Sequence, residues 1–145
     1  MAMAEKTADA PKDIFCNEKI IGGSTIFTVG NVRVALCMDS DSAGLHFLIM
    51  PKQHREYIHE LSPDETRTMQ TAIEKIIEYY KSKGLDGSHK LIVLGGAGAG
   101  SVIPHFHYHI IPGSADFHSN PKERPKHYTP DELKAAAGEI AKELR

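Results

Sequence analysis

The sequence lacks any apolar run of the roughly 20 residues that a membrane-spanning helix needs. It also lacks a basic excess, since 17 Lys and Arg residues stand against 19 Asp and Glu residues in a chain of 145. Proteins that bind the nucleic-acid backbone usually carry a surplus of positive charge. We therefore expect neither a membrane nor a nucleic acid as a partner.

Cysteine is scarce, with only Cys16 and Cys37. Two cysteines do not make a disulfide framework, and a chain of this length can bury a core without one. Residues 1–12 are polar and lack the apolar stretch of a secretory signal peptide. No internal repeat and no low-complexity linker divides the sequence. It predicts a cytoplasmic protein with a flexible tail at residues 1–12 and one domain at residues 13–145.

Short runs rich in β-branched or apolar residues alternate with two amphipathic segments. Strands are predicted at 25–29, 32–37, 45–50, 90–94 and 105–111. Two helices are predicted to begin with the same capping box, at Ser62 and at Thr129, each followed by proline and then by glutamate. This order predicts an α+β domain in which two helices pack on a mainly antiparallel, five-stranded sheet.

The sequence is rich in histidine, with nine residues, three of them at alternate positions of the predicted strand 105–111. Side chains of a strand alternate between faces, so His105, His107 and His109 are expected to share one face. The other face carries apolar side chains that belong in the core: Phe106, Tyr108 and Ile110. Each buried imidazole has two ring nitrogens that need partners. The row therefore predicts a site where a substrate or metal supplies some of these partners, in preference to a solvated strand face.

Two chemistries suit this row of histidines. A neutral imidazole, whose unperturbed pKa is about 6.5, can attack phosphorus and form a covalent phosphohistidine, while a neighbouring imidazole hands a proton to the leaving group. Alternatively, two histidines on one strand face can hold zinc together with a third ligand. His46 lies in the predicted strand 45–50, where it is either a core histidine or a support for the row of three.

A glycine-rich loop at residues 95–101 leads into the histidine strand. It lacks the lysine of a Walker A motif and the spacing of a dinucleotide-binding loop. Successive glycines nevertheless allow backbone N–H groups to converge on an anion. We therefore expect Gly100, Ser101 and Val102 to form a phosphate cradle beside His107.

The segment HFHYHII at residues 105–111 resembles the histidine triad signature, H-φ-H-φ-H-φ-φ with φ apolar. Residues 13–16, 45–52, 59–65 and 99–100 resemble further motifs of the histidine triad (HIT) family, so the resemblance spans about residues 13 to 113. It implies a HIT-like fold, a homodimer, and hydrolysis or transfer of nucleotides at the α-phosphate. It also implies a nucleotidyl intermediate on the middle histidine, His107, with His105, His109 and His46 completing the site.

The resemblance implies purine nucleotide conjugates as substrates: nucleoside phosphoramidates, aminoacyl-adenylates or dinucleoside polyphosphates. It implies no cofactor. Three positions depart from the family pattern. Ser101 stands where many members have glutamine, and Leu94 where many have asparagine. The acidic residue that usually holds the ribose hydroxyls aligns near Met38, so Asp39, one position on, is the expected ribose ligand.

Some members of the family also hold a structural zinc through two cysteines and two histidines. Here Asp13 replaces the first of these cysteines, which leaves Cys16, His54 and His105 as possible ligands. Two alternatives to the hydrolase remain at this point. One is a nucleotide-binding or scaffold protein with weak catalysis, and the other is a zinc-dependent hydrolase that uses the three histidines of residues 105–109 as ligands.

Overall fold

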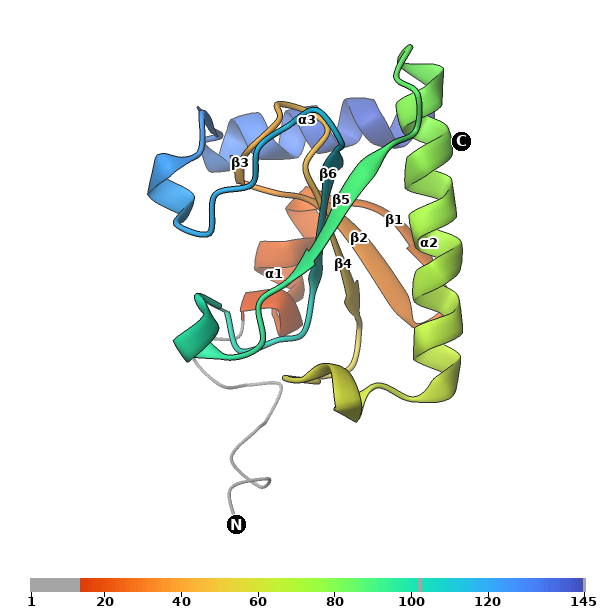
Figure 1. Ribbon diagram of the computed structural model, residues 1–145, viewed down its shortest axis with the longest axis vertical. Helices are drawn as coiled ribbons and strands as arrows, with labels where there is room; N and C mark the ends of the chain where they lie inside the picture. The colour runs from red at the N-terminus through yellow and green to blue at the C-terminus, as the bar shows by residue number, and fades with distance from the viewer. Residues whose placement is uncertain (1–13, 102, 145) are drawn as a thin grey trace.

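The computed structural model describes residues 14–101 and 103–144, and it confirms the predicted α+β fold. A five-stranded antiparallel sheet has the strand order β1-β2-β4-β6-β5 (Figure 1). Its strands are β1 Thr25–Val29, β2 Val32–Leu36, β4 Phe47–Pro51, β5 His89–Val93 and β6 Tyr108–Pro112. A second sheet pairs β3 Asp39–Ser40 with β7 Lys126–His127. The helices are α1 Glu18–Ile21, α2 Pro63–Ser82 and α3 Pro130–Glu143.

Both predicted helix starts are present. The Ser62 hydroxyl accepts the N–H of Glu65, whose carboxylate accepts the N–H of Ser62 in return. Thr129 and Glu132 form the same reciprocal pair at the start of α3. Each capping box satisfies two N–H groups that the first turn of a helix would otherwise leave unpaired.

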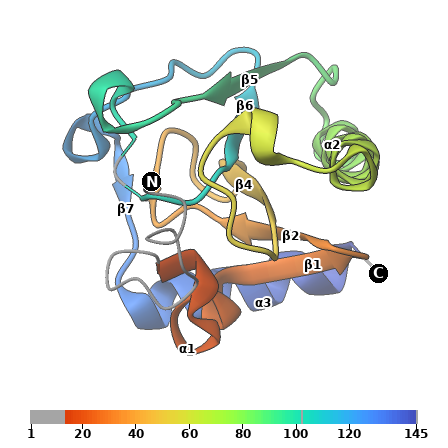
Figure 2. The same ribbon diagram turned by 90° about the horizontal axis from the view of Figure 1, so that it is seen from below.

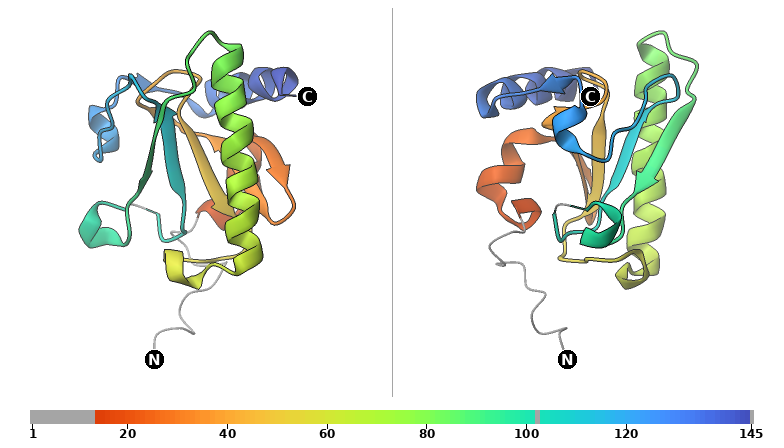
Figure 3. Two further views of the ribbon diagram at one scale, coloured as in Figure 1. Left: turned by 45° about the vertical axis from the view of Figure 1, so that its right-hand side comes forward. Right: turned by 60° about the vertical axis from the view of Figure 1, so that its left-hand side comes forward.

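The two faces of the sheet carry apolar clusters of different size. Phe47 and Ile49 of β4 point into the larger cluster, to which α2 and α3 contribute. Leu48 and Met50 alternate with them and join the smaller cluster, with residues from β2 and α1. The helices α1 and α2 lie on opposite sides of the sheet (Figure 3), and α3 lies across β1 and β2 (Figure 2). The smaller cluster leaves space on its face for a site.

One predicted strand boundary was wrong. Strand β6 begins at Tyr108, so His105 and His107 precede the strand and do not belong to it. The cause is a tertiary contact, because the N–H of Phe106 donates to the carbonyl of Arg55 at 2.5 Å, beyond the end of β4. The alternation of side chains persists through this segment. Phe106 packs edge-on against Tyr108 in the larger cluster, while the histidines point to the other side.

Strand β5 forms one edge of the sheet. Its side chains Leu91 and Val93 are 40% and 39% exposed. None of the helices in the described part of the chain combines the length and apolar character needed to cross a bilayer. The predicted tail 1–12, Asp13 and Val102 lie outside the described residues.

Candidate active site

Four histidines meet where β4 and β6 run side by side. His109 of β6 pairs with Leu48 of β4, and paired residues of antiparallel strands share a face, so His109 lies on the side of the smaller cluster. His46 immediately precedes β4 and has the same orientation as Leu48. His105 and His107 approach from the segment before β6. All four side chains are buried.

A chain of hydrogen bonds fixes the protons of two of these histidines. The backbone N–H of Asp41 donates to Nδ1 of His46 at 2.9 Å, so that nitrogen carries no proton. The proton of His46 is then on Nε2, which lies 2.9 Å from Nδ1 of His109. His109 accepts there and consequently keeps its own proton on Nε2. The backbone of residue 41 thus makes His109 a hydrogen-bond donor through Nε2.

Both of these rings are neutral at physiological pH. Burial, with a smaller contribution from the positive charge of Arg124, lowers the pKa of His46 from 6.5 to about 3. Burial also lowers the pKa of His109 well below its ordinary value, with smaller contributions from His107, His46 and Arg124. A neutral imidazole in this tautomer can hydrogen-bond a phosphate oxygen but has no spare proton to release.

His107 is oriented by the main chain. Its Nδ1 lies 2.8 Å from the carbonyl oxygen of His105, which can only accept, so Nδ1 carries the proton. The lone pair of the ring is therefore on Nε2. The ring packs edge-on against Phe15 at 5.1 Å and lies 4.9 Å from the ring of His109. A nucleophilic imidazole needs this tautomer.

His107 and His109 line a pocket of about 210 Å³. Most of its wall is apolar and comes from α1, β2, β4 and the segments beside them: Phe15, Ile21, Leu36, Met38, Leu48 and Ile103. Gly100, Ser101, Asp39 and Arg124 add polar groups. A mainly apolar pocket with a few convergent polar groups is typical of a small-molecule site.

The glycine loop reaches this pocket, and two of the N–H groups expected to cradle a phosphate are bonded within the loop. The N–H of Gly100 donates to the carbonyl of Ala97, and the N–H of Ser101 donates to the carbonyl of Gly96. The Ser101 hydroxyl donates to the carbonyl of Ile103 at 3.1 Å. These donors are therefore bonded near the loop itself, and the third predicted member, Val102, lies outside the described residues.

His105 faces away from the pocket. Its Nε2 donates to the carbonyl of Pro51 at 2.8 Å, which leaves the lone pair on Nδ1, 3.3 Å from the sulfur of Cys16. Nδ1 of His54 lies 3.8 Å from the same sulfur. The three ligand atoms of Cys16, His54 and His105 lie within 4.8 Å of one another. This donor set fits zinc, and a carbonyl that holds the far nitrogen of a histidine is typical of zinc sites.

The alternative zinc set of His105, His107 and His109 is not among the described groups with metal-ligand spacing, because the ring of His105 is turned toward the carbonyl of Pro51 and the sulfur of Cys16. Among the described residues, the only other group with metal-ligand spacing is Cys37, His46 and His109. Burial raises the pKa of the Cys37 thiol to about 12, and the Arg124 guanidinium lies 3.7 Å from its sulfur. A protonated thiol beside a fixed cation is a poor metal ligand.

Comparison with known proteins agrees with this geometry. The family model for the HIT domain matches residues 22–116. The chain belongs to the histidine triad (HIT) family. An uncharacterized HIT-like protein from Methanocaldococcus jannaschii is 33% identical over 103 residues, which cover 68% of this chain and 77% of the relative. The adenosine 5′-monophosphoramidase of Schizosaccharomyces pombe is 27% identical over 101 residues, which cover 69% and 73%.

The fold is also found among solved structures. A hypothetical histidine triad nucleotide-binding protein from Sulfolobus tokodaii superposes with a TM-score of 0.69 at 24% sequence identity, over 90% of each chain. At this identity the likeness concerns the fold alone.

Asp39, the expected ribose ligand of this HIT protein, lies at the pocket, but it already has partners. Its Oδ1 is 2.8 Å from Nδ1 of His127, and its main-chain oxygen accepts from Nη1 of Arg124 at 3.1 Å. Met38, the position that aligns with the family's acidic residue, is 38% exposed.

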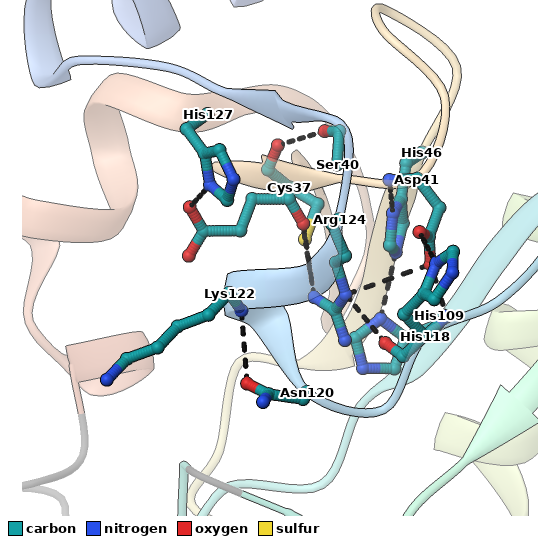
Figure 4. Close-up of polar contacts among 11 residues, drawn as sticks. Cys37, Ser40, Asp41, His46, His109, His118, Asn120, Lys122, Arg124 and His127 are labelled. Carbon is teal, nitrogen blue, oxygen red and sulfur yellow. Dashed lines mark hydrogen bonds and ion pairs between the residues drawn. The ribbon is translucent and has the colours of Figure 1, made fainter.

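Sequence reasoning missed a polar cluster beside the histidines, in which the buried Asp41 and Arg124 meet the partly exposed His118 (Figure 4). The Asp41 carboxylate accepts the backbone N–H of His118 at 2.7 Å and lies 2.6 Å from its Nδ1. Nε of Arg124 lies 3.7 Å from the same carboxylate. Residues 113–128 contain two prolines and many polar residues, a composition that predicts only a loop, and no sequence period links them to residue 41.

Proposed function

We propose that this HIT protein hydrolyses or transfers nucleotides at the α-phosphate of purine nucleotide conjugates, through a covalent nucleotidyl intermediate on His107. The observation that carries the proposal is the tautomer of His107. The carbonyl of His105 accepts from Nδ1, so the lone pair lies on Nε2 of a ring that lines the pocket. A purine ring suits the apolar part of the pocket wall, because the ring has flat faces that can pack against apolar side chains.

In the first step, Nε2 of His107 forms a bond to the α-phosphorus while the bond from phosphorus to the leaving group breaks. The leaving group takes the electron pair and a proton from water. The imidazolium formed on His107 is stabilised by its Nδ1–H bond to the carbonyl of His105. In the second step, water attacks phosphorus, the lone pair returns to Nε2, and the proton of the water passes to solvent.

The other histidines have distinct roles in this scheme. His109 donates Nε2–H to a phosphate oxygen, where negative charge develops during the transfer. It does not serve as the proton donor to the leaving group, because losing its remaining proton would make an imidazolate. His46 positions His109 and holds its tautomer. His105 acts through its main-chain carbonyl, while its ring faces Cys16 and His54.

The name of the S. pombe relative, an adenosine 5′-monophosphoramidase, supports phosphoramidates as the first class of substrate to test. A homodimer is part of the proposal as well. The exposed apolar edge β5 would be covered by pairing with its own copy across a two-fold axis. The ligand set Cys16, His54 and His105 would hold zinc away from the pocket, where the metal would stabilise the fold and take no part in transfer.

A substrate panel tests the proposal directly. Adenosine phosphoramidate, an aminoacyl-adenylate mimic and diadenosine polyphosphates are each incubated with the wild-type protein and with His107→Asn. We expect acid quenching of the wild type to trap an adenylyl-protein, and turnover of the variant to fall by about three or more orders of magnitude, as for other covalent nucleophiles. Near-normal turnover by His107→Asn would exclude the covalent mechanism. Binding of AMP without turnover of any substrate would favour the nucleotide-binding alternative.

A further inference from the structure

Arg124 is a buried cation beside the catalytic histidines, in a segment outside the matched HIT domain. The family model ends at residue 116, and Arg124 follows η6 Pro121–Glu123 in the connection to α3. Its side chain is 4% exposed, yet it lines the same pocket as His107 and His109. The guanidinium carbon lies 5.2 Å from the centre of the Phe117 ring, which also packs edge-on against His109 at 5.1 Å. The cation and the catalytic ring thus share one aromatic neighbour.

Two of the three guanidinium nitrogens of Arg124 hold the group in place. Nε donates to the carbonyl of His118 at 2.8 Å, and Nη1 donates to the carbonyl of Asp39 at 3.1 Å. Within residues 14–101 and 103–144, Nη2 has no hydrogen-bond acceptor. Nη2 is also not among the buried atoms that lack a partner, so solvent reaches it. A rigid fork with one accessible nitrogen can receive an anionic ligand at little entropic cost.

The charge of Arg124 is only partly neutralised. Asp41 is the one carboxylate within ion-pair distance of it in the described part of the chain, at 3.7 Å, and both oxygens of Asp41 already contact His118. The contact with Asp41 raises the pKa of His118. When His118 is protonated, the three groups together carry a net positive charge. Such a cluster favours an anion in the adjoining pocket.

A phosphate in the pocket needs hydrogen-bond donors, and the described N–H groups of the glycine loop that line the pocket are already bonded. The N–H groups of Gly100 and Ser101 are bonded within the loop, and His109 offers one N–H. We propose that Arg124 binds a phosphate oxygen of the nucleotide, and that the segment after the HIT domain thereby sets the preference of this protein for phosphorylated ligands. This inference rests on the proposed function, because it takes a nucleotide as the occupant of the pocket.

The test compares AMP with adenosine, which differ only by the phosphate. Binding of each is measured by calorimetry to the wild type, Arg124→Gln, Arg124→Lys and Lys122→Met. Lys122 is exposed and its side chain points away from the cluster (Figure 4), so its loss is a matched control for removing one positive charge. We expect Arg124→Gln to weaken AMP binding about 10- to 100-fold, the range for loss of a hydrogen bond to a charged group. Adenosine binding should change less than about 3-fold, which is smaller than that single-bond effect.

Arg124→Lys keeps the charge but not the planar fork, so we expect it to recover AMP binding in part. Lys122→Met should match the wild type with both ligands. A purely structural role for Arg124 predicts instead that the affinities for AMP and for adenosine fall by the same factor, because the pocket wall itself is lost. That result, or unchanged AMP binding by Arg124→Gln, would overturn the inference.

Removing Arg124 leaves the Asp41 carboxylate without its cation, so the single variant can lose stability. The double variant Asp41→Asn with Arg124→Gln removes both charges and should show the same selective loss of AMP binding. Because binding is measured and not turnover, the inference stays testable in a protein that turns over no substrate, which would count against the proposed function alone. A wild type that binds AMP no better than adenosine would overturn the inference, and one that binds neither would overturn both.

Discussion

Replacing His46 tests whether a main-chain hydrogen bond controls catalysis through two imidazoles. His46→Leu removes both the acceptor of the Asp41 N–H and the donor to Nδ1 of His109. His109 is then free to carry its proton on Nδ1, which places a lone pair where the phosphate needs a donor. Loss of one preorganised donor to a developing oxyanion costs about 10²- to 10³-fold in kcat. We expect a loss of this size with a smaller effect on KM.

His46→Gln is the matched control for this experiment. A glutamine side chain has an acceptor oxygen for the Asp41 N–H and an amide that can donate to His109. We therefore expect its kcat to stay within about tenfold of the wild type, a loss of up to roughly 1.4 kcal/mol. The buried N–H of Asp41 is unsatisfied only in His46→Leu, which should cost about 1–3 kcal/mol of unfolding free energy. Steady-state kinetics and urea unfolding of the two variants give the comparison. Equal kcat values for His46→Leu and the wild type would refute the relay, as would equal losses in both variants.

The low pKa of His46 alone should lower the free energy of unfolding by about 1.4 kcal/mol per pH unit as the pH drops from 6.5 toward 3, because the unfolded chain protonates His46 there while the folded protein keeps it neutral. His109, whose pKa is also lowered, adds to this fall. The slope of urea midpoints against pH should therefore be shallower in His46→Gln, and identical slopes would contradict the low pKa of His46. Turnover should survive dialysis against EDTA. Cys16→Ser should lower the amount of bound zinc measured by atomic absorption. Activity that is lost with the metal and restored by zinc would argue for a catalytic metal. Light scattering at micromolar concentration should give about twice 16.0 kDa. Leu91→Lys on the exposed edge should give a monomer, while Ile58→Lys, at an apolar position that is even more exposed, should not. A monomeric wild type would remove the dimer from the proposal.

The parts of the fold that were predicted correctly depend on local signals. The helix starts at Ser62 and Thr129 could be predicted because a capping box lies within four consecutive residues. The five strands were predicted from short apolar runs bounded by glycine and proline. Their predicted and observed ends differ by at most two residues, apart from the start of β6. That start depends on the bond between Phe106 and Arg55, a tertiary contact between residues 51 positions apart that no local pattern records.

The site was predictable in part for the same reason. The three histidines at 105, 107 and 109 are a compact pattern, so their separation from the apolar face could be inferred from sequence. The orientation of His105 away from the pocket could not, because it depends on Pro51 and Cys16. The cluster of Asp41, His118 and Arg124 was missed because its members come from distant segments and each residue type is common on solvated surfaces.

Asp41 contributes its backbone N–H to one hydrogen-bond network and its carboxylate to another. Its backbone N–H sets the protons of His46 and His109, and every amino acid except proline supplies that group. Its carboxylate anchors His118 beside Arg124, and only an acidic side chain supplies the negative charge of that contact. A substitution at position 41 can therefore change the contacts of His118 and Arg124 while the tautomers of His46 and His109 stay the same. In the proposed scheme, catalysis and phosphate selectivity both depend on Asp41, but on different atoms of it.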